Sequence, residues 1–437
     1  MEIELLLLLR ALAGVSLYFC FLTLFRFQAT WVGTLKGTSR DKKLIWIIAQ
    51  IAASILSFCV ALPKWFAGNL MIPASLIGGV AFVTGLIKKD VALWCMGLVI
   101  IFISIRHLWR VIKLGAIYKL DHPAQSSQKD ITVEKDISIG TWGDKAQMLL
   151  GDIWMPKNDA YKSGLGIIFL HSGSWNALQK GMTMQWLFRR LARQGHLVLD
   201  LGYPLAPEAD MREMINAVKH AVVWLRSKAI QYLVDPQKLV LWGISGGGQL
   251  ALQAAYTSKA DAKDEVAAVI SCYGPSDMAA HFAEYGRMEP LQPISSDQIT
   301  PEMQPRLFNK TWLDRFITNL HLFPEFRYQN MPGGALLLVN LLGGTLSEKP
   351  LIYHQFSPIH HVSSDSPPTL QIWPAHDFYF GAAVHGRPLH QKLLESGINS
   401  IYLEIPDTEH GFDHFLSAIS LAARVEQNAI LQFLKNL

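Results

Sequence analysis

The sequence predicts an α/β domain preceded by a membrane-spanning helical segment. Three observations lead to this prediction: apolar stretches in the first 120 residues, a change to soluble composition after them, and alternating strand and helix patterns in the remainder. Half of the residues are hydrophobic and only 17% are charged, whereas soluble chains carry about 25% charged residues. The charge deficit excludes a disordered protein or a nucleic-acid-binding tail, and it indicates lipid-facing segments.

The charge balance divides the chain near residue 120. Residues 1–120 contain 13 lysines and arginines against 4 acidic residues, and the remainder contains 26 against 31. The net charge of +4 therefore averages a basic part and a slightly acidic part. We expect a membrane segment over 1–120, a linker and first strand region over 121–145, and a soluble domain over 146–437.

The amino-terminal segment contains apolar stretches long enough to cross a bilayer. A helix rises about 1.5 Å per residue, so about 20 residues cover a hydrocarbon core of roughly 30 Å. The predicted spans are 5–25, 44–63, 65–87 and 91–108. The last contains only 15 consecutive uncharged residues, so a re-entrant or interfacial helix is the alternative there.

The first stretch has a further alternative, a secretory signal peptide. Its apolar run is longer than the 7–15 residues typical of a signal peptide, and acidic Glu2 and Glu4 precede it. An anchor is therefore favoured. Basic residues in the loops favour, by seven to five, an orientation with the soluble domain outside the cytoplasm. No Asp, Glu or His lies near the middle of a predicted span, which disfavours a transporter.

Beyond residue 120, short apolar runs alternate with segments of helical spacing. Runs of about 4–8 apolar residues are typical of buried strands, and they predict strands at 149–155, 165–170, 196–201, 238–244, 265–272, 369–373 and 401–405. Helical spacing predicts helices at 182–194, 208–228, 246–257, 381–396 and 412–437. Strands joined through helices imply a mostly parallel sheet with helices on both faces.

The connection from 275 to 360 interrupts this alternation. It contains about 85 residues, whereas connections in α/β units usually contain about 2–6. We expect an inserted subdomain with helices at 305–320 and 334–342. Long insertions in compact domains are usually functional, so a lid over a ligand site is favoured over a decorative insertion.

The segment Gly243-Ile244-Ser245-Gly246-Gly247 joins a predicted strand to a predicted helix. This G-x-S-x-G pattern in a strand–turn–helix setting is typical of a nucleophile elbow, in which glycines permit a tight turn. The turn exposes the serine hydroxyl at a helix N-terminus, where free N–H groups favour negative charge. We therefore expect Ser245 to be a nucleophile, with an ordinary structural turn as the alternative.

A serine hydroxyl needs a base and an acid that orients the base. His410 follows the last predicted strand, and Asp377 follows the strand before it. The order Ser, Asp, His is that of an α/β-hydrolase, and the three residues fall at carboxyl ends of strands, where open α/β sheets bind ligands. Other local combinations stay open, and they involve His376, Asp407, Asp413 and His414. We expect His414 to be a packing residue near the start of the final helix.

An oxyanion hole requires backbone donors that point at the developing charge. The turn His171-Ser172-Gly173-Ser174-Trp175 follows an early strand, so N–H groups of Gly173, Ser174 and Gly246 are the candidates, with an ordinary Ser/Gly loop as the alternative. His171 is expected to be structural. The pair His360-His361 lacks a second ligand cluster, and the four cysteines show no disulfide or zinc spacing. We assign no metal and no cofactor.

From about residue 148 to its end, the chain resembles the α/β-hydrolase superfamily. In particular, it resembles the carboxylesterases related to hormone-sensitive lipase and to the feruloyl-esterase-like (BD-FAE) group. HSGSW resembles the HGGGW-type oxyanion motif and DLGYPLAPEA the Y-R-L-A-P-E segment, and GISGGG, SPIHHVSSDSPPTLQIWPAHD and EHGF resemble the elbow, acid and base blocks. Ser172 replaces a glycine of that pattern, and Pro204 replaces its arginine.

The resemblance and the triad imply a membrane-anchored serine hydrolase that cleaves carboxylic esters through an acyl-enzyme. Its partners would be a small-molecule or lipid ester and the lipid bilayer, without nucleic acid. A peptidase or amidase and a lipid acyltransferase would use the same triad, and an inactive membrane receptor or scaffold is the alternative from another class. The sequence does not predict the natural ester or the oligomeric state.

Overall fold

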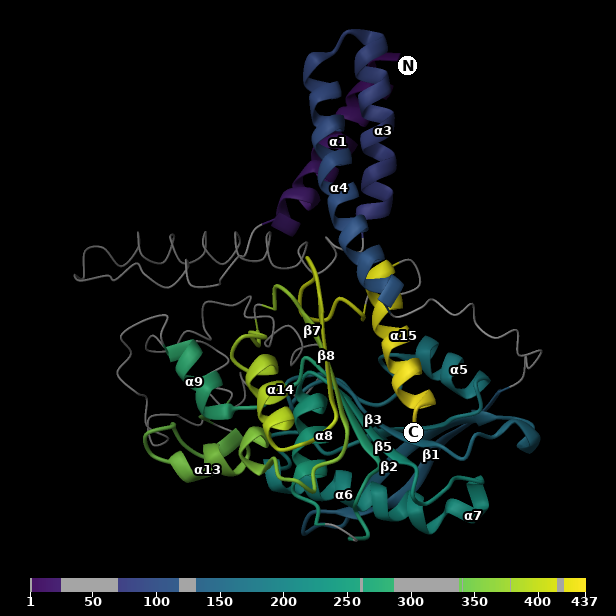
Figure 1. Cartoon of the computed structure of the whole chain (residues 1–437), viewed down its shortest axis with the longest axis vertical. Coiled ribbons are helices and arrows are strands. Elements are labelled where there is room, and N and C mark those ends of the chain that lie inside the picture. The colour runs from purple at the N-terminus through teal and green to yellow at the C-terminus, as the bar shows by residue number, and fades with distance from the viewer. Residues whose placement is uncertain are drawn as a thin grey trace.

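The computed structural model of the chain describes residues 2–24, 70–117, 131–259, 262–286, 338–339, 341–377, 379–414 and 420–437 (Figure 1). The predicted span 44–63, the linker residues 121–130 and the predicted insert helix 305–320 lie outside these residues. The described part forms a helical bundle and, at one end of it, a sheet covered by helices (Figure 1).

Three helices make up the described bundle: α1 (Glu2–Leu24), α3 (Met71–Lys88) and α4 (Val91–Ile117). Glycines let α3 and α4 approach closely, since a Cβ at Gly97 would lie 2.5 Å from the backbone N of Phe82. Large aliphatic and aromatic side chains point outward, with Leu76 68% and Phe102 69% exposed. Within the described residues, α3 and α4 are long and apolar enough to cross a membrane.

The turn between α3 and α4 holds an ion pair that the sequence reading missed. Asp90 caps the start of α4, because its Oδ1 accepts from the backbone N of Leu93 at 3.2 Å. Its Oδ2 lies 2.5 Å from Nη2 of Arg10 in α1. Arg10 therefore lies near the end of the bundle that is remote from the sheet, and its charge is paired there.

Helix α4 is longer than the predicted fourth span. The helix continues past residue 108, where that span was predicted to end, to Ile117; it contains 27 residues, about 40 Å at the usual rise. Basic residues after Ile105 do not end the helix, since this part packs on the soluble domain. Val111 joins the main hydrophobic core, and a Cβ at Gly115 would lie 3.3 Å from Val425.

The soluble domain contains an eight-stranded sheet in the order β1-β2-β4-β3-β5-β6-β7-β8. The strands are β1 (Ile131–Trp142), β2 (Gln147–Pro156), β3 (Gly166–Leu170), β4 (Leu197–Gly202), β5 (Leu239–Ile244), β6 (Ala268–Cys272), β7 (Thr369–Pro374) and β8 (Ser400–Ile405). β2 is antiparallel to both neighbours, and the other pairs are parallel. Each predicted strand position holds a strand, and β1 lies in the predicted first strand region.

Helices cover both faces of the sheet (Figure 1). One face carries α5 (Gln185–Arg193) and α15 (Leu421–Lys435), which are joined by a 2.7 Å hydrogen bond from Arg190 to Gln427. The other carries α6 (Met211–Ser227), with short α7 (Ala229–Tyr232) after it, α8 (Gly246–Tyr256) and α14 (Gly386–Glu395). A capping box between Asp210 and Glu213 begins α6, which satisfies two otherwise unpaired backbone donors.

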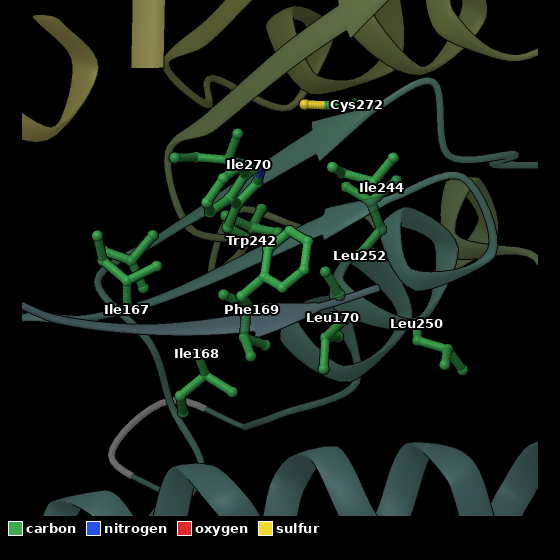
Figure 2. Close-up of a cluster of buried hydrophobic side chains, with 14 of the residues drawn as sticks. Ile167, Ile168, Phe169, Leu170, Trp242, Ile244, Leu250, Leu252, Ile270 and Cys272 are labelled. Carbon is green, nitrogen blue, oxygen red and sulfur yellow. The ribbon is translucent and has the colours of Figure 1, made fainter. Parts of the chain in front are cut away.

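The central strands are apolar on both sides because helices cover both faces. Phe169 of β3 packs against Trp242 of β5 with ring centroids 4.6 Å apart, and Ile270 of β6 lies beside Trp242 (Figure 2). Burial of one such side chain contributes roughly 1.5–3 kcal/mol. This core holds the carboxyl ends of β3 and β5 at fixed positions, and the HSGSW loop and Ser245 follow directly from them.

The final helix begins later than predicted. The prediction placed its start at Phe412, but α15 begins at Leu421, where the Ser420 side chain accepts from the backbone N of Ala423 at 3.1 Å. Residues 411–414 form turns instead. Phe412 belongs to the hydrophobic core in a turn conformation, and periodicity alone does not distinguish such a residue from one in a helix.

The described ends of the insertion pack against α8 and the neighbouring loops. These ends comprise α9 (Met278–Gly286), α13 (Pro350–Gln355) and the 3₁₀ turn η8 (Pro358–His361); the short 3₁₀ turn η4 (Asp159–Tyr161) lies elsewhere, before β3. The described residues of predicted helix 334–342 are helical. Ser357 Oγ accepts from the backbone N of Met278 at 2.7 Å, so the two ends of the insertion contact each other.

Candidate active site

Ser245 lies between β5 and α8 in a strained backbone conformation, with φ of 55° and ψ of −122°. Such strain costs about 1–3 kcal/mol and persists only where the surroundings enforce it. Close packing enforces it here, because a Cβ at Gly243 would lie 2.0 Å from the Gly247 carbonyl oxygen. A Cβ at Gly247 would lie 2.3 Å from the Leu170 carbonyl oxygen. Both glycines are therefore required by neighbouring backbone.

The structure brings the three predicted triad residues together. Ser245 Oγ lies 3.0 Å from His410 Nε2, and His410 Nδ1 lies 2.8 Å from Asp377 Oδ2. Both distances are within hydrogen-bonding range. The three side chains thus form one chain of hydrogen bonds, although they come from loops 132 and 33 residues apart in sequence.

The surroundings of the triad fix the carboxylate and the imidazole. The Asp377 side chain is fully buried, and its Oδ1 accepts from the backbone N–H groups of Tyr379 and Phe380 at 2.9 and 2.8 Å. Aromatic rings surround His410, and the centroid of Tyr273 lies 4.6 Å from that of the imidazole in an edge-on arrangement. The imidazole therefore has a defined orientation toward Ser245.

The predicted oxyanion loop lies against the nucleophile elbow. Gly173 has a φ of 122°, and a Cβ there would lie 1.9 Å from the Ala177 carbonyl oxygen. A Cβ at Gly246 would lie 3.2 Å from the backbone N of Trp175, so the loop and the start of α8 are adjacent. Among the described residues, the N–H groups of Gly173 and Ser174 have no hydrogen-bond acceptor. They remain available to a ligand.

Side chains tie this loop to the rest of the site. Trp175 Nε1 donates to Gln249 Oε1 at 3.0 Å, and Gln249 Nε2 donates to the Phe356 carbonyl at 3.1 Å. The second bond connects α8 to the end of the insertion. The predicted oxyanion loop, helix α8 and the base of the predicted lid are therefore linked by two hydrogen bonds.

His171 lies buried directly before this loop, where a structural role was expected. Its ring stacks on Tyr203 with centroids 4.2 Å apart, and Tyr203 Oη donates to the His171 carbonyl at 2.8 Å. Burial lowers the pKa of His171 to about 4. The imidazole is therefore neutral at physiological pH and packs as an aromatic ring.

A second Ser–His–Asp array, which the sequence reading missed, lies beside the first. Ser172 Oγ lies 2.7 Å from His414 Nε2, and His414 Nδ1 lies 3.0 Å from Asp413 Oδ1. His414 was expected to pack near the start of a helix, but it lies in a turn and bonds to the oxyanion loop. The replacement of a glycine by Ser172 was the available signal, because a new hydroxyl in a buried loop requires a partner.

This array continues into a buried pair of carboxyl groups. Tyr273 Oη donates to Asp413 Oδ1, and Glu426 of α15 lies next to Asp413. Burial and the negative charge of Asp413 raise the pKa of Glu426 well above its usual value. Burial opposes ionisation of Asp413 as well, but His414 and Tyr273 outweigh it and lower the Asp413 pKa. One proton therefore stays on Glu426 while Asp413 is ionised.

The remaining rivals to the triad have other contacts. Asp407 and His376 do not join the triad; they contact each other, with His376 Nε2 3.5 Å from Asp407 Oδ1. Arg110 of α4 donates to the same oxygen at 2.6 Å. The pair His360-His361 makes other contacts, since His360 stacks on His354 and His361 Nε2 bonds to the Gln355 carbonyl. No group of residues suited to a metal ion occurs in the described part of the chain.

Comparisons with known proteins agree with this fold. Residues 151–310 match the protein-family model described as BD-FAE; that stretch contains the HSGSW loop and Ser245 but ends before Asp377 and His410. The chain is 25% identical over 273 residues to esterase LipC of Mycobacterium tuberculosis, an alignment that covers 62% of this chain and 59% of LipC. It is also 25% identical over 338 residues to the probable carboxylic ester hydrolase LipM of the same organism, covering 75% and 67%.

The chain thus spans about three fifths to two thirds of the length of these relatives. Among solved structures, bacterial heroin esterase superposes with a TM-score of 0.50 at 16% identity, covering 75% of this chain and 90% of that chain. Together with the strand order, these similarities show an α/β-hydrolase fold related to carboxylic ester hydrolases.

Proposed function

We propose that this chain is a membrane-anchored serine hydrolase that cleaves carboxylic esters. The observation that carries the proposal is the continuous hydrogen-bond chain Ser245–His410–Asp377, with its distances of 3.0 and 2.8 Å. The similarity to LipC and LipM favours an ester over an amide as the substrate class.

The mechanism follows from the positions of the side chains. Ser245 Oγ attacks the acyl carbonyl while its proton passes to His410 Nε2, and Asp377 stabilises the imidazolium. The oxyanion is stabilised by the N–H groups of Gly173, Ser174 and Gly246. The tetrahedral intermediate then expels the alcohol, which takes the proton from His410. Water attacks the acyl-enzyme with His410 as base, and release of the acid restores Ser245.

The bundle supports membrane anchoring and a hydrophobic substrate. Exposed apolar side chains line α3 and α4 over a length comparable with a bilayer core. The carboxyl ends of β7 and β8, which carry Asp377 and His410, face the bundle, since Asp407 after β8 contacts Arg110 of α4. This contact supports the proposal that a lipid-like ester reaches the site from the side of the bundle.

A fluorophosphonate probe tests the nucleophile. In the full chain in detergent we expect covalent labelling that is abolished in Ser245→Ala and retained in Ser227→Ala, which removes an exposed hydroxyl. Wild-type protein that has not been treated with the probe should hydrolyse p-nitrophenyl esters and leave matched anilides nearly uncleaved. Folded protein without labelling would support a binding scaffold, and preference for anilides would support an amidase. Transfer to added alcohols in place of hydrolysis would support an acyltransferase.

A further inference from the structure

Asp407 lies where helix α4 meets the two loops that carry Asp377 and His410. Its side chain is only 2% exposed, and it comes three residues before His410 in sequence. From α4, Arg110 Nη1 donates to Asp407 Oδ1 at 2.6 Å, and Arg106 Nη1 and His107 Nδ1 each lie 3.5 Å from Oδ2. One buried carboxylate therefore gathers three side chains of a helix that begins in the bundle.

The same carboxylate contacts the loop of the catalytic acid. His376, the residue before Asp377, places Nε2 at 3.5 Å from Asp407 Oδ1. The two loops are also joined through their backbones, because His376 N donates to the Thr408 carbonyl at 3.0 Å. A displacement of Asp407 would therefore be transmitted to His376, next to Asp377, and to Thr408, two residues before His410.

The charge of Asp407 makes the contacts from α4 necessary. Burial by itself would raise the Asp407 pKa, but His107, His376 and the charge of Arg110 outweigh burial and hold the pKa well below its usual value. The group is therefore a carboxylate at neutral pH. Removal of one partner of a buried ion pair leaves a charge without compensation, and the surrounding structure then moves to hydrate it.

Helix α4 is itself fixed on the soluble domain beyond Arg110. Val111 is fully buried in the main core, and Gly115 packs against Val425 of α15. In Figure 1, the carboxyl-terminal part of α4 lies beside α15 at the upper edge of the sheet. Arg110 thus lies on α4 between its bundle part and its contacts with the domain core. The position of Arg110 relative to Asp407 therefore depends on the position and orientation of α4.

We propose that Arg110, acting through Asp407, is a positioning residue for the catalytic loops, so that helix α4 sets the geometry of the Asp377–His410 pair. Neither Arg110 nor Asp407 touches the reacting atoms. The role differs from that of an ordinary anchor, which would keep the domain at a membrane without affecting the chemistry. It goes beyond the proposed function and relies on that function only for its activity readout.

The test compares Arg110→Gln, Arg110→Lys and Lys113→Gln in the full chain in nanodiscs. Lys113→Gln is the matched control, because Lys113 lies on the same helix over the Trp109 ring and, within the described chain, makes no ion pair. The first readout is kcat and KM on a short soluble ester, per site titrated with fluorophosphonate. The second is hydrogen exchange of residues 375–377 and 405–411, measured by mass spectrometry.

We expect Arg110→Gln to lower kcat about tenfold with KM changed less than about twofold, since small displacements of catalytic groups cost up to about a hundredfold. Hydrogen exchange should rise in the two catalytic loops. Arg110→Lys should restore most of kcat, and Lys113→Gln should match the wild type in both readouts.

Three results would overturn the proposal: unchanged kcat and exchange in Arg110→Gln, equal losses in Lys113→Gln, or faster exchange over the whole domain, which would indicate general destabilisation. Failure of the proposed function is a different result, namely a wild type that neither labels nor cleaves esters. In that case, the positioning role would be tested by hydrogen exchange alone, that is, by whether Arg110→Gln raises exchange in residues 375–377 and 405–411.

Discussion

At the scale of single residues, the site depends on backbone positions that few side chains tolerate. Ser245 has a positive φ that is normally unfavourable for serine, and glycines around it allow main chains to approach within distances that exclude a Cβ. Gly173 combines a positive φ with a close carbonyl. These constraints explain why the elbow and the oxyanion loop could be located from sequence.

Gly173→Ala tests the proposed oxyanion hole. The added Cβ would lie 1.9 Å from the Ala177 carbonyl oxygen, so the loop must move. Its N–H groups would then no longer point at the position of the oxyanion. We expect kcat to fall about 10²–10³-fold, the usual cost of one lost oxyanion donor. Gly397→Ala is the control, because Gly397 has a φ of 78° but nothing within 4 Å of its Cβ position. Equal activity in the two variants would contradict the assignment.

The contacts that sequence reading missed share a physical feature. Ser172 and His414 are 242 residues apart, and Arg110 and Asp407 are 297 apart. In each pair, two polar side chains that are far apart in sequence are in direct contact, and no local sequence pattern predicts such a contact. By contrast, Ser245, Asp377 and His410 follow apolar strands whose parallel ends meet at one edge. Their meeting could be inferred from strand order, whereas the pairing of individual polar side chains requires coordinates.

At the scale of elements, two helices have boundaries that hydropathy did not reveal. The predicted fourth span stopped at residue 108, where charge accumulates, but α4 continues because its charged face pairs with Asp407. The predicted final helix started too early, because turn residues 411–414 place His414 and Asp413 in polar contacts. Strands were located more closely, since short buried runs have sharp polar ends. In both helices, tertiary contacts override the local pattern.

Helix α15 carries a buried carboxyl group that lowers stability as pH rises. The Glu426 pKa is raised by burial and by Asp413, so above about pH 4.5 the unfolded chain is ionised there while the folded chain keeps the proton. Folding then becomes less favourable with each pH unit until the raised pKa is passed. The contribution of protonated Glu426 to the free energy of unfolding is present in full only below the pKa that this residue has in the unfolded chain.

Glu426→Gln keeps a neutral group of similar size and removes this penalty. We expect the variant and the wild type to melt together near pH 4, and the variant to melt progressively higher as the pH rises, by about 1.4 kcal/mol, or about 3–5 °C, for each pH unit over which folded Glu426 keeps its proton. Thermal unfolding followed by circular dichroism across that range measures the difference. Glu395→Gln, an exposed residue of α14, should show no such trend. A destabilised Glu426→Gln at pH 8 would mean that Glu426 is ionised.

At the scale of the whole molecule, the bundle and the catalytic edge of the sheet are continuous. A single helix, α4, runs from the apolar bundle to the loops at the carboxyl ends of β7 and β8 (Figure 1). Asp90 and Arg106 bracket its apolar part over about 24 Å at the usual rise. Basic residues after Ile105 would then lie at the headgroup level. If α4 anchors the proposed enzyme in this way, the carboxyl ends of β7 and β8 would lie beside the interface, because Asp407 after β8 contacts Arg110.

Such proximity predicts hydrolysis in cis, that is, of esters in the bilayer that holds the enzyme. We expect a long-chain ester reconstituted in the same nanodisc to be cleaved at a rate independent of nanodisc concentration, because the substrate reaches the site by lateral diffusion. The same ester in separate vesicles should be cleaved at least about tenfold more slowly, since its apolar chain must cross water at about 0.8 kcal/mol per CH₂. Release of fatty acid, measured by mass spectrometry, gives both rates. Ser245→Ala controls for background hydrolysis, and equal rates from the two sources would show that the substrate arrives through water.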